Sequence, residues 1–217
     1  MEVSNFGSVI ESHVHYADGV FKEVQVEHLE LVSSEFHDCM CFHSSFVEST
    51  FRHCRFGNCV FRECDLSLIK LPESRFTSSG FENSKIMGVS STEVHWPKTG
   101  LANPVSFSEC AISYSTFMGL SLHSIHIRDC VATDVDFREA DLFRADFGGS
   151  DLSQSIFGNT KLSQADLTRA RNYRIDPGQS ILKQARFSLP EAMSLLHSMD
   201  IVLVDEDSAA GDAGVLP

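Results

Sequence analysis

The 217-residue sequence lacks an excess of basic residues and has no long apolar run. Its 17 Lys and Arg are outnumbered by 30 Asp and Glu, which leaves a formal charge of -13 and no basic footprint for DNA or RNA. No apolar run approaches the roughly 18 residues that suggest a membrane span. The start, MEVSNFGSVIESHVHYADG, lacks the basic and apolar regions of a signal peptide. We therefore expect no direct nucleic-acid binding, no membrane association and a cytoplasmic location.

Two further scarcities restrict the fold. Seven Cys is an odd number, and without a secretion signal it argues against a disulfide framework. Trp occurs once and Tyr three times, whereas Phe occurs 17 times. Such uneven use of aromatic residues suits one apolar position that recurs along the chain.

That position recurs every five residues. From Phe21 to Ile86 each fifth residue is apolar or Cys, and the pattern resumes one step out of phase from Phe107 to Leu167. A second position, two residues earlier, is mostly small. Its members include Ser34, Cys39, Ser44, Ser49, Cys54, Cys59, Cys64, Ala140, Ala145, Ser150, Ser155, Thr160 and Ala165.

A period of five fits neither a helix nor a plain strand, but it fits a coiled chain. Residues two apart in an extended segment point to the same side, so both positions can face inward. If the chain turns every five residues, four pentapeptides close a coil of about 20 residues, and successive coils stack at roughly 4.8 Å. Residues one coil apart then lie above one another. We expect the columns Phe36/Phe56/Phe76, Phe117/Phe137/Phe157 and Leu122/Leu142/Leu162.

The stretch ADLFRADFGGSDLSQSIFGNTKLSQADLTRA resembles the A-(D/N)-L-x-x signature of pentapeptide-repeat proteins. This resemblance implies an all-β solenoid, a right-handed quadrilateral parallel β-helix, here with a short C-terminal α-helix. We expect an N-terminal cap segment at 1–20, solenoids at 21–86 and 107–170 separated by an interruption at 87–106, a C-terminal helix and strand for dimerisation at 171–204, and a disordered tail at 205–217.

The chemistry-bearing residues give little sign of catalysis. Six Cys occupy the small position and Cys41 the large one, in a spacing that does not suit zinc. Cys39 should stack over Cys59, and Cys110 over Cys130, close enough for a bridge, but plain packing is the favoured interpretation. The ten His are scattered. We expect no catalytic residue, no cofactor and no metal, and hence no enzyme.

The C-terminal segment changes character after Ala170. Ser188 and Glu191 form a predicted capping box, with Pro190 near the start of a helix from about Leu189 to Ser198. Residues 201–204 (IVLV) are predicted as a short strand. The helix either caps the open end of the solenoid or forms a dimer interface, and its many apolar residues favour the interface. The interface candidates are Leu189, Ala192, Met193, Leu195, Leu196, Met199 and Ile201.

The interruption contains the only Trp, Trp96, followed by Pro97. One interpretation is a simple kink between two half-solenoids, and the other is a protruding loop that contacts a partner.

NYRIDPGQ, KQARFSLPEAMSLLHSMDIVL, DLSLI and HWP resemble segments of the pentapeptide-repeat proteins that protect DNA gyrase and topoisomerase IV. The resemblance is closest to the albicidin-resistance type and more distant to the quinolone-resistance (Qnr) and microcin-resistance types. It implies a non-catalytic homodimer that mimics DNA, binds gyrase or topoisomerase IV and relieves inhibition by poisons. The alternatives are a structural or scaffolding solenoid with an unrelated protein partner, and an accessory or sensor that uses the cysteines.

Charge density decides how far such mimicry can extend. Residues 21–170 hold 20 acidic and 13 basic residues, a net charge of -7. Spread over a rod of roughly 32 Å, this is one charge per roughly 4.6 Å, against one per about 1.7 Å in duplex DNA. Mimicry must therefore come from local patches, although Asp before the large residue is also common in the repeat itself. The candidates are Asp134, Asp136, Glu139, Asp141, Asp146, Asp151 and Asp166, and a second cluster of Glu23, Glu27, Glu30, Glu35 and Asp38.

Overall fold

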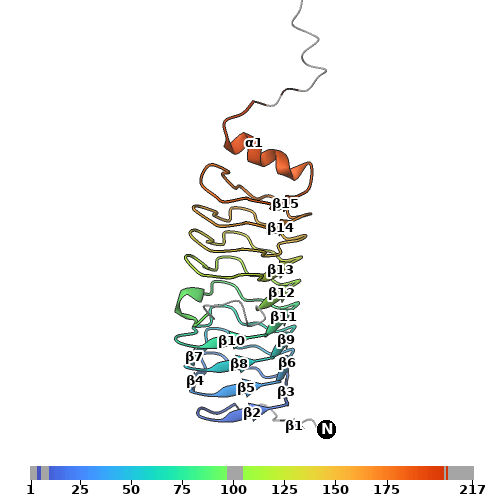
Figure 1. Ribbon diagram of the computed structural model, residues 1–217. Coiled ribbons are helices and arrows are strands. Elements are labelled where there is room, and N and C mark those ends of the chain that lie inside the picture. The colour runs from blue at the N-terminus through green and yellow to red at the C-terminus, as the bar shows by residue number, and fades with distance from the viewer. Residues whose placement is uncertain (1–3, 6–9, 97–104, 203, 205–217) are drawn as a thin grey trace, which may run out of the picture.

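The protein is a rod of stacked coils, seen in a computed structural model that describes residues 4–5, 10–96, 105–202 and 204. The first coil lies at one end of the rod and the C-terminal helix covers the other (Figure 1). Strands of successive coils pair in parallel at the repeat distance of one coil, as in Phe36 with Phe56 and Phe56 with Phe76. The parallel β-solenoid with one short C-terminal helix that the sequence predicted is confirmed.

The strands are short because each spans one side of a coil. The strands are β1 (Ser4–Asn5), β2 (His15–Ala17), β3 (Gly19–Lys22), β4 (Glu30–Val32), β5 (Glu35–His37), β6 (Met40–Phe42), β7 (Thr50–Arg52), β8 (Arg55–Gly57), β9 (Val60–Arg62), β10 (Arg75–Thr77), β11 (Gly80–Glu82), β12 (Ser106–Ser108), β13 (His126–Arg128), β14 (Asp166–Leu167) and β15 (Arg186–Phe187). The helical elements are η1 (Ser91–Glu93), η2 (Glu191–Met193) and α1 (Ser194–Ser198).

The coils stack into four walls, numbered here in chain order. Wall 1 contains β2, β5, β8 and β10, and wall 2 contains the sheet β1-β3-β6-β9-β11-β12-β13 with β14 and β15 further along. Wall 3 is a ladder of isolated bridges that begins Gln25–Ser45–Asp65. Wall 4 contains β4 and β7 and continues as bridges.

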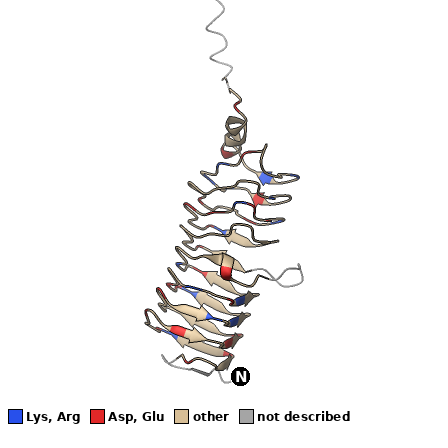
Figure 2. Ribbon diagram, turned by 90° about the vertical axis from the view of Figure 1, so that its left-hand side faces the viewer, with Lys and Arg blue, Asp and Glu red and all other residues tan. Residues whose placement is uncertain are grey.

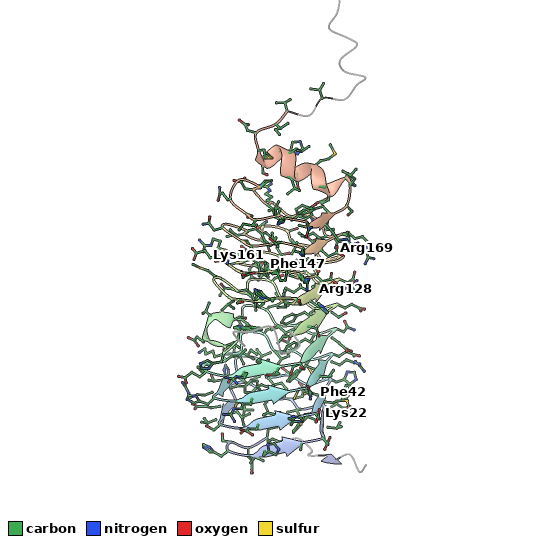
Figure 3. All side chains as sticks on the ribbon, viewed as in Figure 1. Lys22, Phe42, Arg128, Phe147, Lys161 and Arg169 are labelled. Atoms are coloured by element: carbon green, nitrogen blue, oxygen red, sulfur yellow. The ribbon has the colours of Figure 1, made fainter. Side chains whose placement is uncertain are left out.

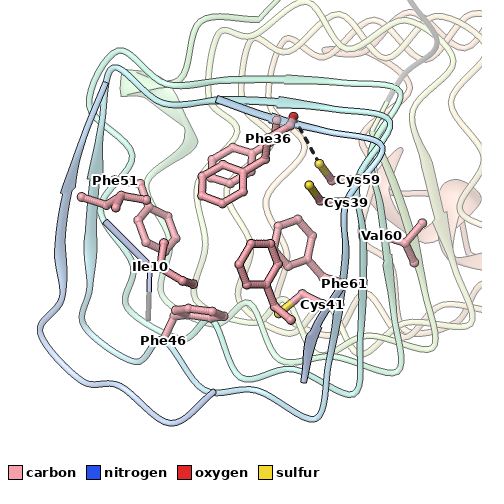
Figure 4. Close-up of a pocket in the computed structure, with 12 residues that line it drawn as sticks. Ile10, Phe36, Cys39, Cys41, Phe46, Phe51, Cys59, Val60 and Phe61 are labelled. Carbon is pink, nitrogen blue, oxygen red and sulfur yellow. Dashed lines mark hydrogen bonds between the residues drawn. The ribbon is translucent and has the colours of Figure 1, made fainter. Parts of the chain in front are cut away.

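The large apolar residue of each pentapeptide fills the middle of the coil. Seen along the axis, Phe36 and the side chains stacked with it point inward from one wall, while Phe51, Phe46 and Phe61 point inward from the others (Figure 4). Rings of successive coils stack nearly parallel, with centroids 5.0 Å apart for Phe36–Phe56 and 4.7 Å for Phe56–Phe76. The column Phe117/Phe137/Phe157 stacks at 5.5 and 5.1 Å. Both predicted aromatic columns are confirmed, and Leu122, Leu142 and Leu162 are likewise buried.

The small inward position has a role beyond its size. Ser74 is fully buried, its Oγ accepts a hydrogen bond from the Cys54 amide (2.9 Å), and it donates one to the Phe51 carbonyl (2.7 Å). Ser150 bridges Cys130 and Ile127 in the same way. These hydroxyls link successive coils from the inside, which the sequence pattern of small residues did not predict.

Most described corners of the coil hold a residue with left-handed backbone. Examples with φ between 53° and 60° are Asp18, Asp38, Glu63, Asp134 and Glu139. The left-handed region costs most residues about 1–2 kcal/mol. The corner amide is compensated by a hydrogen bond to the next coil, for example Asp134 N to Ser153 O at 2.8 Å.

The interruption leaves wall 2 continuous. β11 pairs with β12 across the longer intervening chain, and the Phe81 and Phe107 rings stack at 5.1 Å. The four-stranded sheet of wall 1 ends at β10, and the extra residues fall in the sequence between His95, whose amide donates to the Ser74 carbonyl, and β12. Trp96 packs against the core and its Nε1 donates to the Ser91 carbonyl (2.9 Å). Pro97 lies outside the described residues, so its predicted part in a contact loop stays a prediction.

The C-terminal end differs from the sequence prediction in three ways. The helical segment begins at Glu191 instead of Leu189, as η2 followed by α1. The capping box was wrong, because the Ser188 hydroxyl accepts from the Arg169 amide (2.9 Å) and the Glu191 carboxylate accepts from the Asn172 amide. Both side chains therefore satisfy donors of the last coil, which have no further coil to pair with. Residues 201, 202 and 204 form no strand.

The ladder also extends beyond the range 21–170 that the periodicity predicted. β2 already pairs with β5, and β15 pairs with β14. The predicted disordered tail at 205–217 lies outside the described residues. Among the described residues, no helix combines the length and apolar character needed to cross a membrane.

We predict that Ser74→Ala lowers the free energy of unfolding by about 1–3 kcal/mol, because it leaves the Cys54 amide and the Phe51 carbonyl without this buried partner. Chemical denaturation followed by circular dichroism measures the effect. Ser108→Ala, at an exposed position of β12, is the matched control and should change stability little. Equal effects of the two substitutions would contradict a role for the buried hydroxyl.

Candidate functional site: an acidic surface and an apolar end

Most predicted acidic residues of the second half sit at one position of the repeat, just before the large inward residue. There the carboxylate closes the turn that follows it: Asp146 Oδ1 accepts from the Gly148 amide (2.9 Å), and Asp166 Oδ1 from the Thr168 amide (2.9 Å). Asp136, Asp141 and Asp151 do the same. Asp146 and Asp166 pair in adjacent coils, as predicted. These carboxylates have a structural role in the turns.

Each of these carboxylates also meets a basic side chain. The ion pairs are Asp136–Arg138 (2.7 Å), Asp141–Lys161 (3.3 Å), Asp146–Arg128 (3.3 Å), Asp151–Arg171 (3.2 Å) and Asp166–Arg186 (2.9 Å). Red and blue positions both occur along this part of the rod (Figure 2). The five residues therefore present much less negative charge than their number suggests.

The pKa values reflect these contacts. The hydrogen bond from Arg138 lowers the pKa of Asp136. Burial raises the pKa of Asp151, but hydrogen bonds from Asn172, Ser153 and Arg171 outweigh it and bring that pKa to about 2. Asp151 consequently stays ionised over the whole physiological range and stabilises the coil only in that form.

Asp134 and Glu139 differ from the other acidic residues of the second half. Both occupy left-handed corners and are exposed. They belong to different corners of the coil, so the structure does not join them into one patch with the ion-paired carboxylates.

Negative charge is concentrated in the first coils instead. Residues 10–50 carry eight Asp and Glu and a single Lys, a formal charge of -7. Glu27 and Glu30 are exposed on walls 3 and 4, and Asp38 occupies an exposed corner. Glu23 lies 3.6 Å from Lys22, and Glu35 contacts His15 at 3.4 Å and also Arg55. The second predicted cluster, in the first coils, is therefore offset by fewer bases than the first, in the second half of the rod.

Histidine–carboxylate pairs between coils were not predicted from the sequence. His28 meets Glu48 at 3.5 Å, His43 meets Glu63 at 3.1 Å, and His53 meets Glu73 at 3.2 Å. In each pair the Glu follows the His by one full coil, a signal that was visible once the coil length was known. The pairs link neighbouring coils at their exposed corners.

The seven cysteines are free and buried. Cys39 and Cys59 lie side by side in the interior (Figure 4), and the Cys110 amide approaches Cys130 Sγ at 3.4 Å. Burial raises the pKa of Cys54, which disfavours its reactive thiolate. In the part of the chain that is described, no group of three or more His, Cys, Asp or Glu is arranged to hold a metal ion.

The C-terminal helix has two faces. Leu195 packs against the core together with Leu182 and Phe187, and Ser198 Oγ donates to the Ile175 carbonyl (2.9 Å), so one face caps the rod. The other predicted interface residues are less covered. The exposed members are Leu189 (79%), Met193 (41%), Leu196 (39%), Met199 (53%) and Ile201 (42%), while Ala192 is half-buried.

Comparison with known proteins identifies the class of repeat. A family model described as Pentapeptide repeats matches residues 121–159 and 145–171 in 8 copies. Residues 121–171 therefore carry pentapeptide repeats, as predicted. No curated protein matches the sequence.

Solved structures are similar along most of the rod. Trypsin-treated QnrB1, described as a plasmid-mediated fluoroquinolone resistance protein, is 14% identical with a TM-score of 0.62, covering 88% of this chain and 99% of that one. Full-length QnrB1 is 15% identical with a TM-score of 0.55, covering 84% and 100%. HetL from the cyanobacterium Nostoc, involved in heterocyst differentiation regulation, is 15% identical with a TM-score of 0.52, covering 81% and 85%. At these identities the likeness shows the fold alone.

We predict that Asp151→Asn destabilises the protein at pH 7 and that this deficit disappears on acidification. The folded-state pKa of about 2 lies below the usual value near 3.8, so the contribution of Asp151 is complete above about pH 4 and is lost as the pH falls towards 2. Urea unfolding midpoints measured at several pH values test this. Asp134→Asn, at an exposed corner, is the control substitution and should change stability little.

Proposed function

We propose that this protein binds DNA gyrase or topoisomerase IV in the cytoplasm and protects the enzyme from a DNA-cleavage poison, without catalysing a reaction. The observation that carries the proposal is the concentration of negative charge on the first coils of a rod of duplex width. The likeness of the fold to QnrB1, a fluoroquinolone resistance protein, supports it. In this proposal the acidic coils occupy part of the enzyme's DNA-binding surface.

The width of the rod and the charge density of its first coils are both similar to those of duplex DNA. One side of a coil spans five residues less its corner, which gives a width on the order of 20 Å, similar to a DNA duplex. Residues 10–50 make about two coils, or roughly 10 Å of rod, so their charge of -7 corresponds to one charge per roughly 1.4 Å. Duplex DNA has one per about 1.7 Å. The rest of the rod falls well short of this density because bases nearly balance its carboxylates: residues 51–170 hold 14 Asp and Glu and 12 Lys and Arg.

The apolar side of the C-terminal helix supports a homodimer. Leu189, Met193, Leu196 and Met199 are exposed next to the capped end of the rod. Exposed apolar patches of this kind mark interaction sites in soluble proteins. Two rods joined at these ends would place their acidic first coils at the far ends of the assembly.

Protection is tested with purified gyrase that supercoils relaxed plasmid in the presence of albicidin or a fluoroquinolone. We expect this protein to restore supercoiling as it is titrated in. The double substitution Glu27→Gln/Glu30→Gln removes two exposed charges of the first coils and should raise the concentration needed several-fold. Glu109→Gln/Glu139→Gln removes two charges from exposed corners of the second half and is the matched control.

The outcomes of this assay separate the candidate functions. Restored supercoiling that depends on Glu27 and Glu30 supports protection through the first coils. Inhibition without rescue would leave a DNA mimic that does not protect. No effect of the wild-type protein on gyrase, or on topoisomerase IV assayed in parallel by decatenation, with or without drug, would contradict the proposal and favour a scaffolding solenoid with another partner.

We predict that Met193→Glu/Leu196→Glu converts the dimer to a monomer, because it places charges in the apolar contact. Light scattering coupled to size-exclusion chromatography measures the mass. Ile156→Glu, at an exposed apolar position on wall 4, should leave the dimer intact. A wild-type protein that is monomeric at micromolar concentration would refute the interface.

A further inference from the structure

One outward position of wall 2 is apolar in the first coils, where the same position of the other walls is polar or charged. Within the first coils, the outward position before the large residue holds Val20, Met40 and Val60 on wall 2. The equivalent residues are His15, Glu35 and Arg55 on wall 1, Gln25, Ser45 and Asp65 on wall 3, and Glu30, Thr50 and Lys70 on wall 4. The difference belongs to one face and not to the coils as a whole.

These residues form a continuous strip along the rod. Val20 pairs with Met40 and Met40 with Val60 in the register of β3, β6 and β9. Phe42 joins them from the second outward position of β6, and the guanidinium of Arg62 lies 5.7 Å from the centre of its ring. Val60 points away from the interior (Figure 4), and Phe42 lies on the outer side of the same wall (Figure 3). Met40 is 41% exposed and the other three are half-buried.

Carboxylates border the strip on both sides, because left-handed corners flank β3, β6 and β9. Asp18 and Asp38 precede β3 and β6, while Glu23 and Glu63 follow β3 and β9. The strip also contains two bases: Lys22 lies 3.6 Å from Glu23, and Arg62 lies 2.6 Å from Glu82. His43 at the end of β6 meets Glu63, and His37 meets Asp38 at 2.6 Å. With His neutral, five carboxylates against two bases leave the border negative.

We propose that this strip, defined by Val20, Met40, Phe42 and Val60, docks a basic amphipathic helix of a partner protein. The strip is apolar along Val20, Met40 and Val60, with Lys22 and Arg62 beside Phe42. Its border carries a net negative charge, which complements a helix with a Leu-like face bordered by Lys or Arg. The turns of a helix are spaced by about 5.4 Å and the strands by about 4.8 Å, so successive apolar residues of the helix can seat on successive strands. This inference is independent of the proposed function.

Two other occupants fit the charges less well. A second copy placed face to face on the strip would bring two negative borders together. The chain's own residues 205–217 contain four Asp and Glu and no Lys or Arg. A basic partner is the one whose charge complements the border.

The experiment uses a fluorescein-labelled peptide of Leu and Lys, about five helical turns long, with its Leu residues at helical spacing, and a scrambled peptide of the same composition. Fluorescence anisotropy is recorded with the full-length protein, Met40→Glu and Val131→Glu. Val131 is 50% exposed on wall 3 and serves as the matched apolar control. We expect Met40→Glu to raise the Kd at least tenfold and Val131→Glu to change it less than twofold. A second variant, Val60→Thr, should weaken binding in the same direction without adding charge.

Equal binding of the ordered and scrambled peptides would overturn the proposal, because it would show attraction by net charge alone. Equal Kd values for Met40→Glu and Val131→Glu would place the site elsewhere and overturn it as well. Concentration-dependent dimerisation lost in Met40→Glu would identify a second copy as the occupant, contrary to the proposal. Circular dichroism and denaturation midpoints establish that each variant keeps the solenoid.

Discussion

The backbone hydrogen bonds between successive coils are the constraint on which the rest of this structure depends. They require that each wall return to the same register after every coil, so Phe36 faces Phe56 and, across the interruption, Phe81 faces Phe107. Each coil contacts only its neighbours, as in other solenoids. Large side chains must therefore stack on similar ones, and every corner must supply an amide to the next coil. The last coil has no such neighbour, and there the side chains of Ser188 and Glu191 accept the amides of Arg169 and Asn172.

The periodicity was enough to predict the fold and the interior. The positions of Phe36, Phe56 and Phe137 follow from a period of five and the geometry of an extended chain. The corners were beyond the pattern, because residues as different as His, Glu and Leu accept the left-handed backbone there once a hydrogen bond to the next coil holds it. The capping box was wrong for a related reason. Local sequence rules assume that a side chain serves its own helix, whereas tertiary contacts determined the partners of Ser188 and Glu191.

The acidic surface shows why composition alone describes charge poorly. Asp146 and Asp166 looked like members of a patch, yet they close turns and face Arg128 and Arg186. Their partners lie in neighbouring coils, so pairing could be inferred only once the coil length was known. Glu27 and Glu30 belong to coils with few bases, and their exposure is what makes the first coils the stronger candidate site. The apolar strip was missed because its members are spread over three strands and no short segment contains more than two of them.

The continuity of wall 2 across the interruption has a consequence for how such a rod changes length. The register of wall 2 is the same on both sides of the added residues, so the separation between the acidic coils and the apolar end depends on the number of coils and not on the number of residues. A chain of this kind can gain or lose surface segments during evolution while its two ends stay the same distance apart. Only the addition or removal of a complete coil would alter that distance, and it would do so in fixed steps of one strand spacing.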